Sequence, residues 1–454
     1  MNVLFLTPYI TDFTAYDLWL RPLGLMKLAN TVHTRTDCRV FWLNPLDRYA
    51  VPGVTSEHDD GRGHFHRAVI TKPDVFKSIP RNYARYGWPL ELFFSRLNEL
   101  PVMDLICMTT LMTYWVDGAR FTLQAAKSHS PAAVAVVGGV LPTLMPAASR
   151  REIPSNRYIS GPGETELLDI IRRMGGRVTP GANDSNAGID RFLSPDDPAY
   201  PLLTSRGCPM RCSYCASRLL FPGFRERPVS EVIGEIGKAR RRRRHFVFFD
   251  DALLIHKETR FLPLARAAIR MNLCLHTPNG IHVREIDAVT ARALHGAGAR
   301  TLRLSLETTS PSIHKRGSGK ADTGAMHGAV DNLLAAGFSP ADLETYVLWG
   351  LPGQSIASVH ATLNFVETLG IIPRLADYSP VPGTPDCRRL QSAGRLGGPL
   401  DPHATNKVFH LFHTSGYSQN DIRGVRDRCR EITLKVRNIY KSLPPGCLKS
   451  MHST

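Results

Sequence analysis

Short apolar runs alternate with helical patterns twice along this chain of 454 residues, and this alternation restricts the folds open to it. Strands that alternate with helices predict a parallel sheet covered by helices on both faces. The first series occupies residues 1–176, and the second begins at residue 198. We therefore predict an α/β protein with two successive parallel sheets.

The first series predicts a doubly wound, Rossmann-like sheet. A helical pattern covers Leu23–His33, and short turns rich in glycine follow the later strands. Ligands of open parallel sheets bind beyond the carboxyl ends of the strands, so we expect a ligand at these turns. The expected strands are Val3–Leu6, Val40–Leu43, Asp104–Thr109, Ala133–Val137 and Tyr158–Ser160.

The second series, residues 198–395, contains six strand–helix units and follows a linker at residues 177–197 that is rich in turn-forming residues. A complete eight-unit barrel typically needs about 250 residues, so we predict a partial (β/α)6 barrel of the TIM type. Residues 396–454 are expected to form a small helical extension with a basic helix at Asp421–Lys441. The expected strands are Leu202–Ser205, Phe246–Asp250, Asn272–Thr277, Thr301–Leu306, Thr345–Trp349 and Arg374–Ser379.

Three of the nine cysteines, Cys208, Cys212 and Cys215, follow the first strand of this second series with the spacing C-x3-C-x2-C. A tight group of cysteines indicates a metal site, whereas scattered cysteines are usually small buried apolar residues. Three thiolates on one loop can hold an iron–sulfur cluster and leave one iron without a protein ligand. The alternative is a zinc site completed by a distant histidine or cysteine.

This motif resembles the signature of the radical S-adenosylmethionine (SAM) superfamily, and the resemblance covers residues 198 to about 390. It implies that the three cysteines bind a [4Fe–4S] cluster, whose fourth iron holds SAM. It also implies reductive cleavage of SAM to a 5′-deoxyadenosyl radical. Such clusters have low reduction potentials, which implies an electron donor of the flavodoxin or ferredoxin type.

The same resemblance assigns SAM contacts along the predicted barrel. An aromatic residue precedes the third cysteine, an acidic pair stands where the family more commonly has Gly-Gly-Glu, and a Gly-Leu-Pro-Gly turn follows the fifth strand. Structural roles are the alternatives to SAM contact. Ser305 and Glu307 could simply alternate onto the barrel-facing side of a strand, and the Gly-Leu-Pro-Gly segment could be a tight turn that needs glycine. The assigned SAM contacts are Tyr214, Asp250, Asp251, Ser305, Glu307, Gly350 and Pro352.

A polar group after the third strand, His276, Asn279 and His282, is a candidate for substrate contact. Single histidines are also common as structural residues, and that alternative stays open. The sequence assigns no catalytic residue and does not identify the substrate, which we expect to be a small molecule or a peptide.

Residues 1–176 resemble the cobalamin-binding domain that precedes the barrel in one large class of radical SAM enzymes. Small residues in the matching segments would allow a large flat ligand to approach the sheet. The Asp-x-His-x-x-Gly motif that supplies a histidine to cobalt in many cobalamin proteins is missing. The segment Asp401-Pro402-His403 begins like this motif, but it lies in the C-terminal region and has Asn406 where the motif has glycine. A domain retained without cobalamin is the alternative. The assigned glycines are Gly24, Gly138, Gly139, Gly161 and Gly163.

The leading hypothesis is a cobalamin-dependent radical SAM enzyme, with methyl transfer as the reaction that it suggests. The alternatives are a cobalamin-independent radical SAM enzyme, which would catalyse rearrangement, methylthiolation or RNA modification, and a non-catalytic iron–sulfur protein.

The net charge of +16 would suit a nucleic-acid partner, but aromatic residues are not interleaved with the basic runs. The run Arg240–Arg244 is better explained as a helix end, so nucleic-acid binding is not favoured. Met1–Pro8 has no basic leader, and Gly and Pro interrupt the uncharged stretch Ser130–Ser149. We interpret this stretch as a buried strand followed by a loop, and we expect a cytoplasmic protein without a membrane span.

Overall fold

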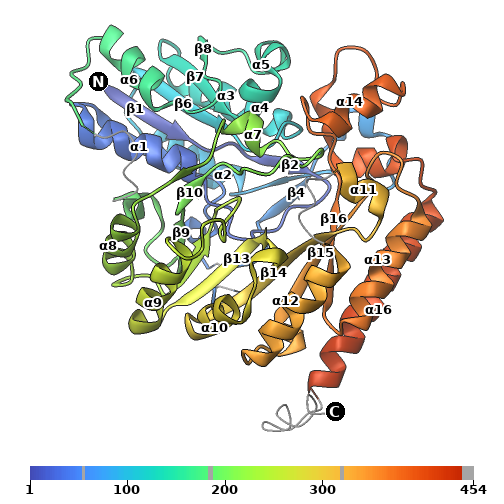
Figure 1. The fold of residues 1–454 in the computed structure, drawn as a ribbon. Helices are drawn as coiled ribbons and strands as arrows, with labels where there is room; N and C mark the ends of the chain where they lie inside the picture. The colour runs from blue at the N-terminus through green and yellow to red at the C-terminus, as the bar shows by residue number, and fades with distance from the viewer. Residues whose placement is uncertain (54–56, 182–187, 317–321, 442–454) are drawn as a thin grey trace.

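The computed structural model describes residues 1–53, 57–181, 188–316 and 322–441, which form two parallel sheets with helices around them (Figure 1). The first sheet has the strand order β3-β1-β6-β7-β8, and all of its neighbouring strands are parallel. This order confirms the predicted doubly wound sheet. Its strands are β1 (Asn2–Leu6), β3 (Arg39–Leu43), β6 (Leu105–Thr110), β7 (Val134–Gly139) and β8 (Arg157–Tyr158).

The central strand β1 is buried on both faces. Val3 and Phe5 pack against α1 (Leu23–Arg35) and α6 (Glu164–Arg173). Leu4 and Leu6 point to the opposite face, because successive side chains of a strand alternate. On that face lie α2 (Leu90–Asn98), α3 (Val116–His129) and α5 (Pro146–Glu152). Burial on both faces explains why these strands are continuous apolar runs in the sequence.

The second sheet has six parallel strands in the order β9-β12-β13-β14-β15-β16, which confirms the partial barrel. Its first and last strands do not pair with each other, so the barrel is open between them. The strands are β9 (Ala199–Leu202), β12 (His245–Phe248), β13 (Cys274–Ile281), β14 (Ala299–Glu307), β15 (Leu343–Trp349) and β16 (Ile372–Asp377).

Helices cover the outer face of this sheet (Figure 1). Five of them alternate with the strands, and the C-terminal helix α16 (Gln419–Lys441) packs against β16 and α13. The predicted basic helix is therefore an integral part of the barrel wall. These five covering helices are α8 (Val229–Ala239), α9 (Phe261–Met271), α10 (Ala288–Gly296), α12 (Thr323–Ala335) and α13 (Ile356–Thr368).

Three features of the fold differ from the sequence prediction. The first barrel strand lies at Ala199–Leu202 and not at the expected Leu202–Ser205. A small antiparallel sheet forms from β2 (Ile10–Asp12), β4 (Arg67–Val69) and β5 (Ala84–Tyr86), whose strands are too short to show a period. The stretch after β7 is not a loop, because α4 (Val140–Leu144) and α5 follow it directly. Pro146 takes the first position of α5, where a missing backbone N–H costs no hydrogen bond. Among the described residues, no helix has the length and apolar character needed to span a membrane.

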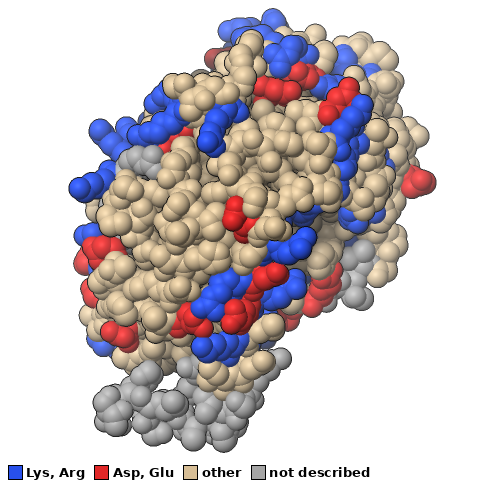
Figure 2. Space-filling model, turned by 90° about the vertical axis from the view of Figure 1, so that its right-hand side faces the viewer, with Lys and Arg blue, Asp and Glu red and all other residues tan. Residues whose placement is uncertain are grey.

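Part of the basic charge is paired with acidic side chains. On the face drawn in Figure 2, basic and acidic side chains lie next to each other. Arg428 and Lys435 of α16 form ion pairs with Glu367 of α13. Arg243, from the arginine run after α8, is buried and binds Asp190 at 2.8 Å. The run therefore does not present all of its arginines to a nucleic acid.

His403 lies in a short helical turn, residues Pro402–Thr405, and joins the C-terminal region to the first sheet's layer of helices. One of its ring nitrogens contacts Asp117 of α3 at 2.8 Å, and the other contacts Asp401 at 3.1 Å. Burial lowers the pKa of His403, but the hydrogen bonds with the two carboxylates outweigh burial and raise the pKa to about 9. Both nitrogens are thus engaged in ion pairs, which agrees with the prediction that this Asp-x-His is not a cobalt ligand.

We predict that this ion triad makes stability depend on alkaline pH. Folding raises the pKa of His403, so its contribution is complete below pH 6.5 and is lost as the pH rises through 9. The loss should be on the order of 2 kcal/mol in the free energy of unfolding. Urea unfolding at pH 6.5 and pH 9.5 measures it, with His403→Gln as the comparison. An equally steep decline in His403→Gln would contradict this assignment.

Candidate active site

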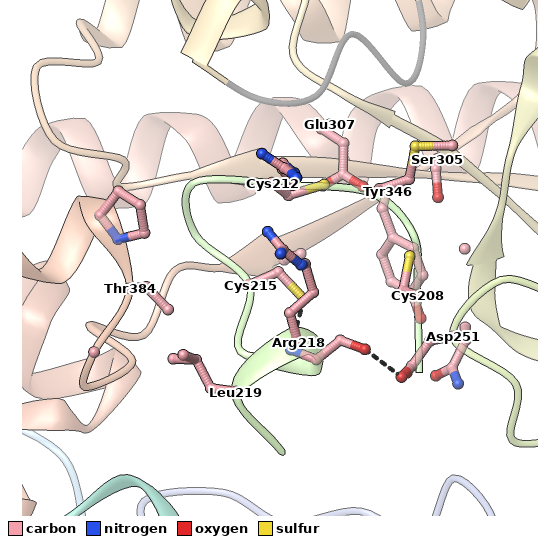
Figure 3. Close-up of a pocket in the computed structure, with 18 of the residues that line it drawn as sticks. Cys208, Cys212, Cys215, Arg218, Leu219, Asp251, Ser305, Glu307, Tyr346 and Thr384 are labelled. Atoms are coloured by element: carbon pink, nitrogen blue, oxygen red, sulfur yellow. Dashed lines mark hydrogen bonds between the residues drawn. The ribbon is translucent and has the colours of Figure 1, made fainter. Parts of the chain in front are cut away.

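A cavity of about 680 Å³ lies at the carboxyl ends of the barrel strands (Figure 3). Cys208, Cys212 and Cys215 all line it, as do Ser305 and Glu307 at the end of β14. Figure 3 shows the three cysteine side chains around one part of this cavity. The structure thus brings the cysteine motif together with side chains from distant strands.

The cysteines lie on the loop between the short strand β10 (Ser205–Arg206) and the helix α7 (Ser217–Leu220). β10 pairs with β11 (Arg225–Glu226), which closes the segment into a compact unit. Gly207 begins the loop with φ +78°, and a Cβ there would lie 2.1 Å from the carbonyl oxygen of Gly223. The start of the loop therefore requires glycine.

Buried hydrogen bonds hold the cysteine loop in place. The Ser213 hydroxyl donates to Asp386 at 2.7 Å, and the Asp386 N–H donates to the Ser213 carbonyl at 3.0 Å. Asp386 belongs to α14 (Pro385–Ser392), far along the chain. At the other end of the loop, the Ser217 hydroxyl donates to Asp251 at 2.5 Å. The cysteines are thus positioned from two sides.

The donor set fits an iron–sulfur cluster. Cys208 and Cys212 are buried, Cys215 is exposed to the cavity, and none of the described cysteines forms a disulfide. Three thiols on one loop are the ligands that a cluster with one open iron needs. The Ser217 N–H also points to the Cys215 sulfur, at 3.5 Å.

The structure separates the two members of the acidic pair. Asp250 is buried and accepts hydrogen bonds from the Thr204 N–H, the Thr204 hydroxyl and the Ser205 hydroxyl, and it pairs with Arg260 at 3.2 Å. It does not line the cavity. Asp251, in the bend that follows β12, does line it. The expected SAM contact at Asp250 is therefore corrected to a structural role, and Asp251 keeps the expectation.

Glu307 has a strained backbone. Its φ of +71° lies in the left-handed region, and the pairing of β14 with β15 shifts register between Ser305 and Glu307. Such strain costs about 1–3 kcal/mol and concentrates at functional sites. Ser305 packs tightly on Gly280, where a Cβ would lie 2.1 Å from the Ser305 hydroxyl oxygen. Both side chains line the cavity, as the sequence predicts for barrel-facing residues.

Three other predicted contacts lie outside the cavity lining. Tyr214 packs among apolar residues that include Leu351, and burial raises the pKa of its phenol, with Glu307 adding to the effect. Gly350 has φ +88°, and its carbonyl oxygen lies 2.6 Å from the ring nitrogen Nε2 of His410. Neither Gly350 nor Pro352 faces the cavity, so the alternative of a tight turn describes this segment.

Of the three residues predicted to contact substrate, one lines the cavity and two do not. Asn279 lines the cavity, and its amide donates to the carbonyl oxygens of Phe249 and Asp250, both at 3.2 Å. His276 is fully buried against His245, at 2.9 Å, and burial lowers its pKa to about 3. His282 is buried as well and does not line the cavity. The two histidines are therefore corrected to structural positions, while Asn279 stays a candidate.

A second cavity, of about 420 Å³, lies between the carboxyl edge of the first sheet and the start of the barrel. A Cβ added at Gly24 or Gly161 would meet no atom within 4 Å, so these glycines leave space open to the cavity. The barrel contributes Arg206, which pairs with Glu164 of α6 at 3.0 Å. All five predicted glycines line this cavity: Gly24, Gly138, Gly139, Gly161 and Gly163.

The two cavities meet at Asp251, which lines both. Sequence reasoning missed several side chains that complete the first cavity. Arg218 follows the third cysteine closely and could have been noticed, but Arg388 and Tyr346 carry no local signal. They reach the site only because α14 and β15 bring them there.

Known proteins resemble this chain in sequence and in fold. The profile of the radical SAM superfamily matches residues 202–366. An uncharacterised methyltransferase of Pyrococcus horikoshii is 24% identical over 62% of this chain and 68% of its own length. The bacteriochlorophyllide d C-12(1)-methyltransferase of Chlorobaculum tepidum is 24% identical over 56% of this chain and 59% of its own length.

Solved structures resemble almost the whole chain. The radical SAM methyltransferase TsrM of Kitasatospora setae, with cobalamin and a [4Fe–4S] cluster bound, superimposes with a TM-score of 0.66, at 14% identity, over 95% of this chain and 88% of its own. The cobalamin-dependent SAM radical enzyme OxsB superimposes with a TM-score of 0.62, at 12% identity, over 98% of this chain and 69% of its own. Residues 202–366, which carry the cysteine motif at the barrel mouth, thus match the radical SAM superfamily.

Proposed function

We propose that this protein is a cobalamin-dependent radical SAM methyltransferase. The observation that carries the proposal is the pair of adjoining cavities that share Asp251. One cavity has the thiols for a cluster, and the other has an edge of glycines open to a flat ligand. Two cofactors held in these places would be neighbours, which a methyl transfer between them and a substrate requires.

In the first cavity, Cys208, Cys212 and Cys215 would hold a [4Fe–4S] cluster beside SAM. When bound, this pair supplies reductive cleavage of SAM to a 5′-deoxyadenosyl radical. The carboxylates of Asp251 and Glu307 would attract the cationic amino group of SAM, because opposite charges attract strongly in a partly buried site. A low-potential reductant is needed, and we propose a donor of the flavodoxin or ferredoxin type.

In the second cavity, the five glycines would let a corrin ring lie against the carboxyl edge of the first sheet. Cobalamin would supply a carrier for the methyl group. Among the described residues, no histidine lines this cavity, which agrees with the missing Asp-x-His-x-x-Gly motif. The lower face of the ring would therefore rest on residues of other types.

Methyl transfer is supported by the curated relatives. Two of them are named as methyltransferases, and the solved TsrM structure is a methyltransferase that holds both cofactors. A second candidate reaction is methylthiolation, because the ribosomal protein uS12 methylthiotransferase RimO of Chloroflexus aurantiacus is 26% identical over 49% of this chain. Cobalamin binding would favour the first reaction over the second.

We predict that replacing Cys208, Cys212 and Cys215 together by alanine abolishes the cluster, because no other ligand set remains in the cavity. After anaerobic reconstitution, formation of 5′-deoxyadenosine with dithionite and SAM should fall by more than about 100-fold. Iron and sulfide analysis and chromatography measure the two effects. Cys429→Ser, a change outside both cavities, is the control and should keep iron and activity. Full iron content in the triple variant would rule out this cluster site.

We predict that Gly24→Leu weakens cobalamin binding. The new side chain would project into the second cavity without backbone strain, since Gly24 lies in α1 and its Cβ position is open. Cobalamin affinity should fall roughly 5- to 150-fold, the range expected from overpacking a built site. Absorption spectra after gel filtration measure bound cobalamin.

Gly234→Leu is the matched control, because Gly234 is also a helical glycine with open space but lies on α8 away from both cavities. It should bind cobalamin like the original protein. If the original protein binds no cobalamin while it cleaves SAM, the cobalamin-independent reaction replaces our proposal.

A further inference from the structure

Three arginines line the first cavity without an acidic partner. They are Arg211 on the cysteine loop, Arg218 on α7 and Arg388 on α14. Arg211 and Arg218 form no hydrogen bond or ion pair with any residue that the structure describes. The Arg388 guanidinium donates only to the carbonyl oxygen of Gly383, at 2.5 Å. Most other arginines near the cavities, such as Arg206 and Arg260, are paired with carboxylates.

The acidic side chains of the cavity come from a different wall. Asp251 and Glu307 stand at the ends of barrel strands, and Asp251 is hydrogen-bonded to Ser217. Figure 3 shows Thr384 and Leu219 on the side of the cavity away from Ser305 and Asp251, with Arg218 extending between the two sides. The cavity thus combines two carboxylates that follow barrel strands with arginines from the cysteine loop, α7 and α14.

The start of α14 adds to the positive charge of the arginines. Gly383, Thr384 and Pro385 line the cavity, and Thr384 caps the helix by accepting from the Cys387 N–H. A helix N-terminus carries partial positive charge and favours anions. Asp386 does not cancel it in the cavity, because its carboxylate is buried in bonds to Ser213 and Arg389 and does not line the cavity.

SAM and the cluster together do not account for all three arginines, because a [4Fe–4S] cluster with three thiolates carries only a small net negative charge. SAM carries two cationic groups, which suit the acidic side chains of the cavity. Its one carboxylate can bind at most one guanidinium group. The remaining guanidiniums suit a second anionic molecule, since arginine binds carboxylate and phosphate in two-pronged geometry. A volume of about 680 Å³ lies within the range of small-molecule sites.

We propose that Arg211, Arg218 and Arg388 form an arginine wall that binds a carboxylate or phosphate group of the substrate, which is therefore a small organic anion. This inference rests on the proposed function of the same cavity. The arginine wall would hold the anionic group of the substrate, and Asp251, which lines both cavities, marks where the rest of the molecule can reach the second cavity.

The test uses the reconstituted holoenzyme with cobalamin, dithionite and [methyl-¹⁴C]SAM. Deproteinised cell extract is separated by ion exchange into anionic, neutral and cationic fractions, and each is offered as substrate. Label should enter the anionic fraction. Phosphatase treatment of that fraction abolishes labelling if the recognised group is a phosphate monoester. Labelling that survives phosphatase and is lost after esterification with diazomethane identifies a carboxylate.

The arginine variants then test the wall itself. Arg218→Gln and Arg388→Gln should each raise the KM for the labelled fraction by about 10- to 100-fold, as expected for losing a charge-assisted hydrogen bond. Arg270→Gln removes the same charge from the exposed end of α9, outside the cavity, and should leave the KM unchanged. A matching loss of SAM affinity in the two cavity variants would assign these arginines to the carboxylate of SAM and overturn the proposal.

Two further outcomes overturn it. Label in the neutral or cationic fraction, or SAM cleavage with no label in any fraction, would show that the substrate is not a small organic anion. Absence of SAM cleavage under all conditions is a different result, because it would remove the proposed function on which the arginine wall rests.

Discussion

The buried carboxylate of Asp250 is the interaction on which the rest of the site depends. It accepts from the Thr204 and Ser205 hydroxyls, both at 2.6 Å, and pairs with Arg260. A buried charge is tolerated only when it is fully paired, and these bonds join the end of β12 to the segment that leads into the cysteine loop. The same arrangement turns Asp251 toward both cavities.

Two sheets of the same kind explain why there are two cavities side by side. Each parallel sheet leaves its binding region beyond the carboxyl ends of its strands, and here the two regions adjoin. The ion pair between Arg206 and Glu164 crosses from the barrel to α6 at this junction. The C-terminal region supports the site from outside, through Asp386 on Ser213 and through His410 on the carbonyl oxygen of Gly350.

The first cavity is lined by side chains of both charges, which come from different elements of the fold. Strand ends supply Asp251 and Glu307, while a loop and two helices supply arginines. A cationic cofactor would be attracted to the carboxylates and an anionic molecule to the arginines before any specific contact forms. Glu307, with its left-handed backbone, lies two residues from Ser305, which packs closely on Gly280.

Local patterns in the sequence determined the strands and helices of both sheets, the cysteine motif and the five glycines that line the second cavity. These features depend on period, spacing and the absence of a side chain, which neighbouring residues reveal. Only the tertiary structure decided that Asp251 and not Asp250 faces the cavities, that His276 is buried beside His245, and that Arg388 joins the cysteines. Side-chain direction at a strand end and contacts between distant segments depend on packing across the whole fold, so no local pattern contains them.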